Sequence, residues 1–168
     1  LKERGIVSGY PDGSFQPDRT VNRVEALKML MLAFEVPSGV AGPLPFRDTD
    51  DGARYATALA AAMEKQIVKG YDDQTFRPAQ TVNRAEYLKI LFNSSGTPFE
   101  GSLIAKPYSD VERTDWFAPF AYLANQKNLL DVTEDRLLPA SGMTRALVAE
   151  TIYRMKMIQE NELLSYSK

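Results

Sequence analysis

Three arginines recur at a fixed spacing and are suited to binding an anion. Arg23, Arg84 and Arg145 lie 61 residues apart, and each directly follows an Asn or Thr that can cap the start of a helix. A cation at the first helical position opposes the helix dipole, so helix propensity alone does not explain these arginines. An arginine beside free N-terminal amides suits a carboxylate or phosphate. Two interpretations stay open at this point, a structural salt bridge or an anion site.

The glutamates that follow two of these arginines have a simpler role. Segments 22–25 and 83–86 fit the capping box, in which the N-cap side chain accepts from the N3 amide and the Glu reaches back. We therefore predict that Glu25 and Glu86 cap helices rather than contact a ligand. Segment 144–147 keeps the capping Thr but has Leu in place of Glu.

The missing residue types exclude most catalytic chemistry. The chain has no Cys and no His, which removes thiolate nucleophiles, zinc–thiolate sites, and the Ser-His-Asp and HExxH schemes. Nothing supplies the positioned acid and base that catalysis needs. We predict that the protein is not an enzyme and has no catalytic residues, cofactor or metal. The acidic segment 48–52 does not match the EF-hand loop, and we expect its carboxylates to cap backbone amides.

Whole stretches of sequence recur with the arginines. Segments 9–30, 70–91 and 131–152 align without a gap at this spacing. A unit of roughly 60 residues is marginal alone, so an internal repeat indicates copies that are stabilised by packing on one another. We predict a single domain over residues 1–168, with its function where neighbouring copies meet. Repeat one, repeat two and repeat three cover approximately residues 1–36 (a partial copy), 46–95 and 108–163.

Each complete unit is predicted to be a helix, a structured loop and a second helix. Residues 53–66 have high helix propensity, and Tyr55, Leu59 and Met63 form one apolar stripe. The predicted fold is all-α, a pseudo-threefold helical spindle in which helices 22–35, 83–95 and 144–160 pack together and helices 53–66 and 115–127 complete repeats two and three. The residues expected to face one another in the core are Leu27, Leu30, Met31, Phe34, Leu88, Leu91, Phe92, Ile152 and Tyr153.

Composition and charge narrow the class of partner. A hydrophobic fraction of 44% with 25% charged residues is typical of a soluble globular protein. The net charge is −2 and charges of both signs are interspersed, so the sequence does not indicate a basic surface that binds nucleic acid. No apolar run approaches the ~20 residues that span a bilayer. We therefore expect neither a nucleic-acid partner nor a membrane span.

The repeated residues resemble the S-layer homology domain. That family's repeat runs roughly F-x-D, W-A, then G-I-x-x-G-Y-x-D-G-T-F-x-P and T-R-A-E. Residues 5–17 with 22–25, and residues 67–78 with 83–86, are close matches. Repeat three supplies Tyr108-Ser109-Asp110, Trp116 and Thr144-Arg145-Ala146. The resemblance covers nearly the whole chain in three copies that share one register.

The resemblance implies a bacterial surface module that binds a polymer in grooves between repeats. Such domains anchor surface or S-layer proteins non-covalently to the cell envelope, outside the cell. Their usual ligand is a secondary cell-wall polysaccharide, often carrying pyruvate ketals, or a peptidoglycan-linked polymer. The family's arginine corresponds to Arg23, Arg84 and Arg145 and would pair with a ligand carboxylate. Its other groove residues correspond to Asp48, Asp110, Trp116, Tyr55 (a weaker match), Gly9, Tyr10, Gly70 and Tyr71.

Repeat three departs from the family pattern. Asp131 and Val132 replace the Gly-Tyr pair, and an acidic side chain there would repel an anionic ligand. We therefore expect the best groove to use Arg23 or Arg84 rather than Arg145, because only repeats one and two keep the Gly-Tyr loop. Degenerate grooves would favour an alternative function, in which the repeats mediate protein–protein contacts in a surface layer.

Repeat one begins at its loop, so the helix that precedes this loop in the other repeats has no counterpart in the chain. An apolar face that includes Ile6, Val7 and Phe15 is then expected to need cover, because monomers rarely expose such a patch. We expect upstream sequence, the stretch 161–168 or a second copy of the chain to supply it, and a homo-oligomer through the incomplete repeat is the preferred outcome.

Overall fold

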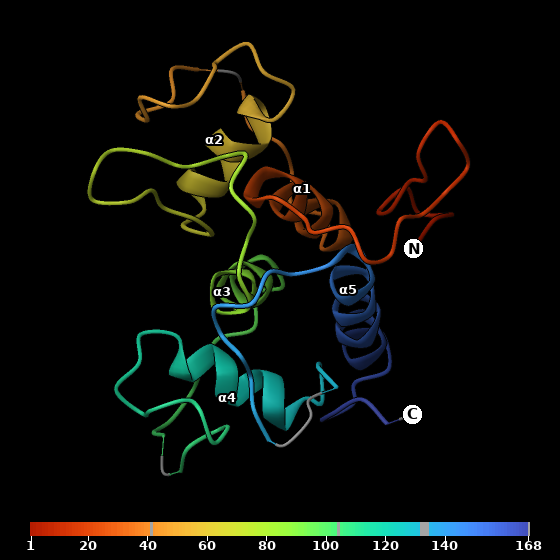
Figure 1. Ribbon diagram of the computed structural model, residues 1–168, viewed down its shortest axis with the longest axis vertical. Coiled ribbons are helices and arrows are strands. Elements are labelled where there is room, and N and C mark those ends of the chain that lie inside the picture. Colours follow the sequence, from red (N-terminus) through yellow and green to blue (C-terminus); the bar gives the residue numbers. More distant parts are fainter. Residues whose placement is uncertain (41, 104, 132–134, 168) are drawn as a thin grey trace.

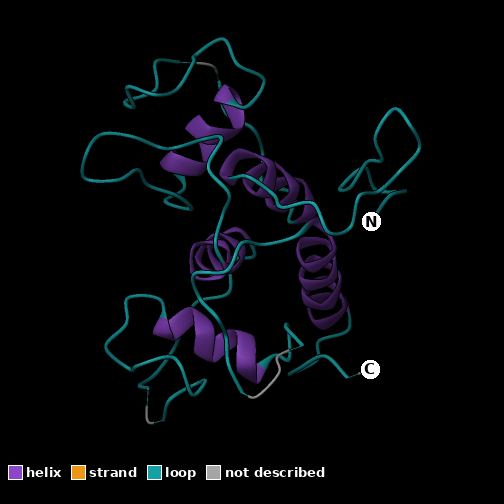
Figure 2. Cartoon of the chain, viewed as in Figure 1, coloured by secondary structure: helices purple, strands orange, loops and turns teal. Residues whose placement is uncertain are grey.

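The computed structural model describes residues 1–40, 42–103, 105–131 and 135–167. The described residues form helices joined by loops and turns, without a strand (Figure 2), which confirms the predicted all-α class. None of these helices has the length and apolar character needed to cross a membrane. The helices are α1 (Arg23–Ala33), α2 (Ala56–Glu64), α3 (Arg84–Ser94), α4 (Ala118–Gln126) and α5 (Arg145–Glu160).

Capping determines where α1, α3 and α5 begin. Each starts at its repeated arginine, directly after an extended Asn or Thr whose side chain accepts from the N3 amide. The helices α2 and α4 have no such side-chain cap, and both are shorter than the predicted 53–66 and 115–127. Turns precede both helices. Ala53 and Arg54 therefore lie outside α2, although their residue types favour a helix.

The three capped helices lie at the middle of the molecule, with α2 and α4 toward the outside (Figure 1). The helix α1 contacts both α3 and α5, while α2 packs against α1 and α4 against α3. Each outer helix therefore packs against the central helix of the preceding repeat. The loop that follows each outer helix therefore also lies at the boundary between its own repeat and the preceding one.

The core between the central helices contains most of the predicted residues. All of them are buried or half-buried except Tyr153, whose predicted core position is wrong because it is 46% exposed. A fully buried pair also joins α3 to α5, with the Tyr87 hydroxyl 2.7 Å from the Thr151 hydroxyl. Burial raises the pKa of Tyr87, so this phenol stays neutral.

A ring of backbone hydrogen bonds closes the three repeats on one another. The Val21 N–H donates to Met143 O at 2.9 Å, Met143 N–H to Val82 O at 2.9 Å, and Val82 N–H to Val21 O at 3.0 Å. These three residues occupy the same position in their repeats, 61 residues apart. Each repeat thus donates to one neighbour and accepts from the other. A common threefold axis for the whole body stays a prediction.

The apolar face of repeat one is covered in part by the chain itself. Ile6 is only 4% exposed, so Ile6 does not need the cover that we expected from outside repeat one's own packing, while Val7 and Phe15 are half-buried. Arg4, close to Ile6 in sequence, forms an ion pair with Glu160 at the end of α5. The helix α5 has 16 residues, compared with 11 in α1. Its extra length places its C-terminal end beside the segment that contains Arg4 and Ile6.

The C-terminal stretch makes its described contacts elsewhere, through Tyr166. The Tyr166 N–H donates to Lys127 O at 3.0 Å, and the Tyr166 ring lies 5.1 Å from the guanidinium carbon of Arg154. Both contacts belong to repeat three. Association through a second copy of the chain stays a prediction.

One left-handed position in the repeat loops offers a test of local strain. The equivalent residues Gly13, Gln74 and Asp135 have φ of 80°, 60° and 52°. Only Gly adopts this conformation without a steric cost. We expect Gln74→Gly to raise the free energy of unfolding by about 0.5–1 kcal/mol, measured by urea denaturation.

The matched control is the reverse change in repeat one. A Cβ at Gly13 meets no atom within 4 Å, so Gly13→Ala adds backbone strain without a clash. It should lower the free energy of unfolding by about 1 kcal/mol. A destabilised Gln74→Gly variant would contradict the argument.

Candidate functional site

The capping boxes hold two of the arginines in place, as predicted. The Asn22 and Asn83 side chains each accept from the N3 amide at 2.9 Å, and Glu25 and Glu86 reach back to the cap amides. The Thr144 hydroxyl accepts from Leu147 N at 3.3 Å without a reciprocal Glu. Each arginine is therefore the first helical residue, at the boundary between two repeats.

The arginine side chains cross that boundary and donate to a backbone carbonyl of the neighbouring repeat. Arg23 donates to Phe76 O at 3.0 Å, Arg84 to Leu137 O at 2.6 Å, and Arg145 to Phe15 O at 2.9 Å. The three acceptors are equivalent residues of the repeat loops, which we define as residues 6–17, 67–78 and 128–139. The first role of these arginines is thus to join repeats.

Arg23 is the most completely enclosed of the three. It is 5% exposed, and its guanidinium carbon lies 5.0 Å from the Tyr71 ring centroid and 4.7 Å from that of Phe76. Its Nη1 atom lies 3.4 Å from the Glu86 carboxylate, which also accepts from the Tyr71 hydroxyl. Burial, and then this hydrogen bond, raise the pKa of Tyr71. Glu86 therefore forms a buried ion pair in addition to its capping role.

Among the described residues, no carboxylate forms such a pair with Arg145 or Arg84. Arg145, 9% exposed, donates also to Ser8 O at 2.8 Å and lies 4.9 Å from the Tyr10 ring centroid. Arg84 is half-buried and forms no ion pair within the described part of the chain. Among the described residues, its buried Nε atom has no hydrogen-bond partner. Arg84 is thus the arginine with the most unused donor capacity.

The pairing of arginines with loops corrects the sequence-based prediction about grooves. That prediction assumed that an arginine and the loop of its own repeat share a groove. Instead, Arg23 meets the Gly70-Tyr71 loop and Arg145 meets the Gly9-Tyr10 loop. Arg84 meets the altered loop of repeat three through Leu137 O. The Gly-Tyr loops therefore accompany Arg23 and Arg145, and the reason given for excluding Arg145 is wrong.

An acidic residue of the altered loop of repeat three is paired with a cation. The Asp131 carboxylate lies 2.9 Å from the Arg154 guanidinium, whose side chain is 1% exposed. Arg154 also pairs with Glu150. The predicted repulsion of an anionic ligand is therefore reduced by an adjacent cation. Val132, the other altered residue, lies outside the described residues.

The repeated aspartates hold their own loops. Asp48 accepts from the amides of Phe76 and Arg77, both at 2.8 Å. Asp110 accepts in the same way from the amides of Leu137 and Leu138. Because both carboxylate oxygens are engaged, these residues position the loop directly. Nearby, Asp50 accepts from Gly52 N and Asp51 from Leu44 N, which confirms the predicted capping role of the acidic segment.

The two aromatic candidates differ in exposure. The half-buried Tyr55 accepts from Asp50 N at 3.1 Å and belongs to this local network. Trp116 is 56% exposed and lies edge-on to Phe117 at 5.4 Å between ring centroids. The Lys89 ammonium lies 5.5 Å from the Trp116 ring centroid. Trp116 is therefore an accessible aromatic face that spans the boundary between repeats two and three.

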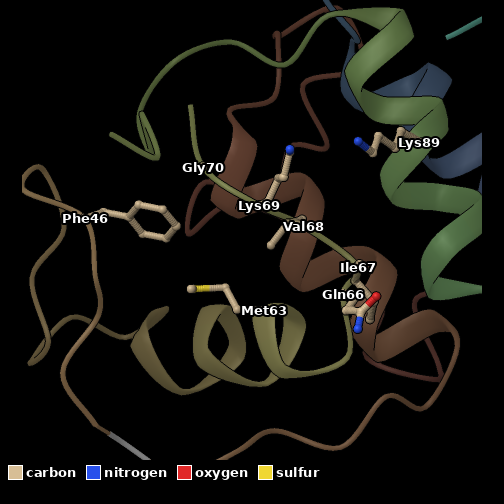
Figure 3. Close-up of a pocket in the computed structure, with 8 residues that line it drawn as sticks. All are labelled: Phe46, Met63, Gln66, Ile67, Val68, Lys69, Gly70 and Lys89. Carbon is tan, nitrogen blue, oxygen red and sulfur yellow. The ribbon is translucent and has the colours of Figure 1, made fainter. Parts of the chain in front are cut away.

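A pocket of about 490 Å³ lies close to this face. It is lined by Phe46, Met63, Gln66, Ile67, Val68, Lys69, Gly70 and Lys89 (Figure 3). The glycine is required sterically, since a Cβ at Gly70 would lie 2.1 Å from Phe46 Cε1. Phe46 also packs on Phe76 at 5.5 Å between ring centroids, which fixes one wall. The predicted Gly70 thus shapes the pocket.

Two lysines in this pocket were missed by sequence reasoning. Lys69 follows α2 on the loop, and Lys89 lies on α3. Burial lowers the pKa of Lys89, and the charges of Lys69 and Arg23 lower it further. A search restricted to residues shared by all three repeats could not find this pair, because neither position keeps Lys in all three.

Comparison with known proteins identifies the repeats. Residues 1–27 and 45–88 match the family model of the S-layer homology domain. The chain carries S-layer homology repeats. The match takes in the loops, capping boxes and arginines of repeats one and two. Repeat three lies beyond the matched residues and is related to the other two repeats by its register and its equivalent contacts.

Several bacterial surface proteins are similar to these S-layer homology repeats. A cell surface glycoprotein 1 of Acetivibrio thermocellus is 34% identical over 55% of this chain and 4% of its own length. A cellulosome-anchoring protein of the same species is 30% identical over 69% of this chain and 26% of its own length. The S-layer protein sap of Bacillus anthracis is 25% identical over 90% of this chain and 19% of its own length.

These relatives place the S-layer homology repeats on the bacterial cell surface, outside the cell. The chain spans about a quarter or less of the length of the curated relatives that it matches. The similarity therefore concerns one module of much longer proteins.

Proposed function

We propose that this chain binds a non-peptidoglycan polysaccharide of the bacterial cell wall and thereby holds a larger surface protein there. The family match and the relatives named for the cell surface, anchoring and S-layers support the anchoring role. Binding of this kind needs no catalysis, and the same relatives support a non-catalytic module.

The observation that carries the proposal is the exposed Trp116 beside a concave surface. Sugar rings carry apolar C–H faces, which pack on flat aromatic side chains. Trp116 offers such a face at 56% exposure, and Lys89 joins it to the pocket of Phe46 and Gly70. Binding sites for small ligands typically combine an apolar surface with a few polar groups in this way.

The remaining candidates have supporting roles in this proposal. Asp48 and Asp110 hold the loops, and Arg23 and Arg145 join repeats beside Gly70, Tyr71, Gly9 and Tyr10. Arg84 makes fewer of the described contacts than Arg23 or Arg145, and its half-buried guanidinium is our candidate to pair with a carboxylate of the polymer, such as a pyruvate ketal. Tyr55 supports the turn before α2.

The test is retention of the chain on purified cell-wall sacculi before and after extraction of the non-peptidoglycan polymer. Loss of binding on extraction supports the polysaccharide, and unchanged binding points to peptidoglycan. Absence of binding to either preparation favours the alternative function, a module for protein–protein assembly in a surface layer, which sedimentation of the chain would then test.

We expect Trp116→Ala to weaken retention on intact sacculi by about 10- to 50-fold. This corresponds to losing roughly 60–90 Å² of apolar contact at about 25 cal/mol per Å². Trp116→Phe keeps an aromatic face and should restore most of the affinity. Equal retention of the wild-type and Trp116→Ala proteins would remove Trp116 from the site.

A further inference from the structure

A second pocket, of about 290 Å³, lies where α1, α2 and α3 end, and we call it the helix-end pocket. It shares Ile67 with the first pocket, but the other residues that line it are different. The helices α1 and α3 begin at Arg23 and Arg84. The helix-end pocket therefore lies at the opposite ends of these helices from the repeated arginines.

Ser94, the last residue of α3, lines this pocket and is polar at a position where the repeats otherwise have apolar residues. Its equivalents in α1 and α5 are Ala33 and Met155, each 1% exposed. Ser94 is 6% exposed, and among the described residues its hydroxyl has no hydrogen-bond partner. Burial of an unpaired hydroxyl is unfavourable, so packing alone would favour an apolar residue here. An occupant of the pocket would supply the missing partner.

Two side chains of opposite charge line the same pocket. Glu35 directly follows the C-cap of α1, and Lys65 is the C-cap of α2. Both are exposed, and within the described part of the chain neither forms an ion pair, with the other or with any third residue. Two unpaired charges of opposite sign suit a ligand that carries both an ammonium and a carboxylate.

The rest of the wall sets the size and the character of the ligand. Phe34 and Val36 are half-buried and line the pocket with apolar groups. The volume is at the lower end of the range for ligand sites, so the ligand must be compact. These walls fit a small apolar group that bears the two charges.

We propose that the helix-end pocket binds a small zwitterion, an α-amino acid with a compact side chain. Lys65 pairs with its carboxylate, Glu35 with its ammonium, and the Ser94 hydroxyl forms a hydrogen bond with it. This site is additional to the polysaccharide site and does not depend on it, because none of these three residues lines the first pocket.

The test titrates the purified, isotopically labelled chain with alanine and follows the backbone amide signals of Ser94 and Gly96 by NMR. We expect saturable shifts. N-Acetylalanine lacks the ammonium and alaninamide lacks the carboxylate, so each should bind at least about 10-fold more weakly. Equal binding of all three compounds, or no saturable shift with alanine, would overturn the proposal, since the pocket then holds only water. Tighter binding of dialanine, whose charges lie further apart, would overturn the assignment to an amino acid.

Variants assign the contacts. Glu35→Gln/Lys65→Gln should weaken alanine binding by about 10- to 100-fold. The matched control is Glu64→Gln, at an exposed neighbouring position that does not line the pocket, and it should bind like the wild type. A similar loss in this control would overturn the site, because nonspecific attraction between charges would explain the effect.

Ser94→Ala gives a combination of results that a purely structural role does not. It should weaken alanine binding by about 3- to 10-fold, yet be at least as stable as the wild type in urea without alanine, because an unpaired buried hydroxyl is removed. Unchanged alanine binding would overturn the contact with Ser94. The experiment uses no sacculi, so its outcome is separate from that of the polysaccharide proposal.

Discussion

Replacing Arg23 with alanine is expected to lower the free energy of unfolding by about 3–5 kcal/mol, measured by chemical denaturation. The side chains of Arg23 and Glu86 are 7% and 13% exposed, so the change leaves a buried carboxylate without its cation. It also removes the hydrogen bond to Phe76 O, which joins repeat one to the loop of repeat two. A buried ion pair contributes little net stability, but removal of one partner is costly.

Two matched variants make this prediction specific. Arg84→Ala removes the equivalent residue, but Arg84 is half-buried and, within the described residues, has one side-chain hydrogen bond and no ion pair. It should cost only about 1–2 kcal/mol. Arg54→Ala, at an exposed position, should change the free energy of unfolding by less than about 0.5 kcal/mol. Equal losses for Arg23→Ala and Arg84→Ala would show that the ion pair with Glu86 is not the cause.

This contrast also shows how far the sequence predicts the fold. Capping boxes and helix propensity are local, and they located the starts of α1 and α3 correctly. The 61-residue period identified Arg23, Arg84 and Arg145 as equivalent residues. It could not say which copy each side chain contacts, because contact within a repeat and contact with the next repeat have the same period. The structure supplies that answer through Phe76, Leu137 and Phe15.

The pocket of Phe46 and Gly70 could not be predicted from the sequence for a related reason. Its lining comes from the segment before α2, the loop of repeat two and α3, which meet only through tertiary packing. Lys69 and Lys89 are not shared by the three copies, so the repeat pattern does not mark them. The same pattern becomes informative once the pocket is known, because it then shows that the pair is confined to repeat two.

Gly70→Ala is expected to lower the free energy of unfolding by about 2–4 kcal/mol and to abolish binding in the pocket. The new Cβ would lie 2.1 Å from Phe46 Cε1 and 2.7 Å from Thr75 O. The Phe46 ring can rotate away, but the Thr75 carbonyl belongs to the backbone of a loop held by Asp48. Relief of the clash therefore requires the loop to move. Such movement separates Phe46 from Phe76 and opens the wall of the pocket.

Gly9→Ala provides the control, because Gly9 is the equivalent residue of repeat one. Beyond the two adjacent residues, the atom nearest to a Cβ there is the Ser14 carbonyl oxygen at 3.1 Å, and no aromatic ring comes closer than 4 Å. It should cost no more than about 1 kcal/mol and leave retention on sacculi unchanged. Heat or urea denaturation of both variants gives the stabilities, and sacculus retention gives the binding. If Gly70→Ala is as stable as Gly9→Ala, Phe46 does not pack against the loop, and the wall that Phe46 gives to the pocket is absent.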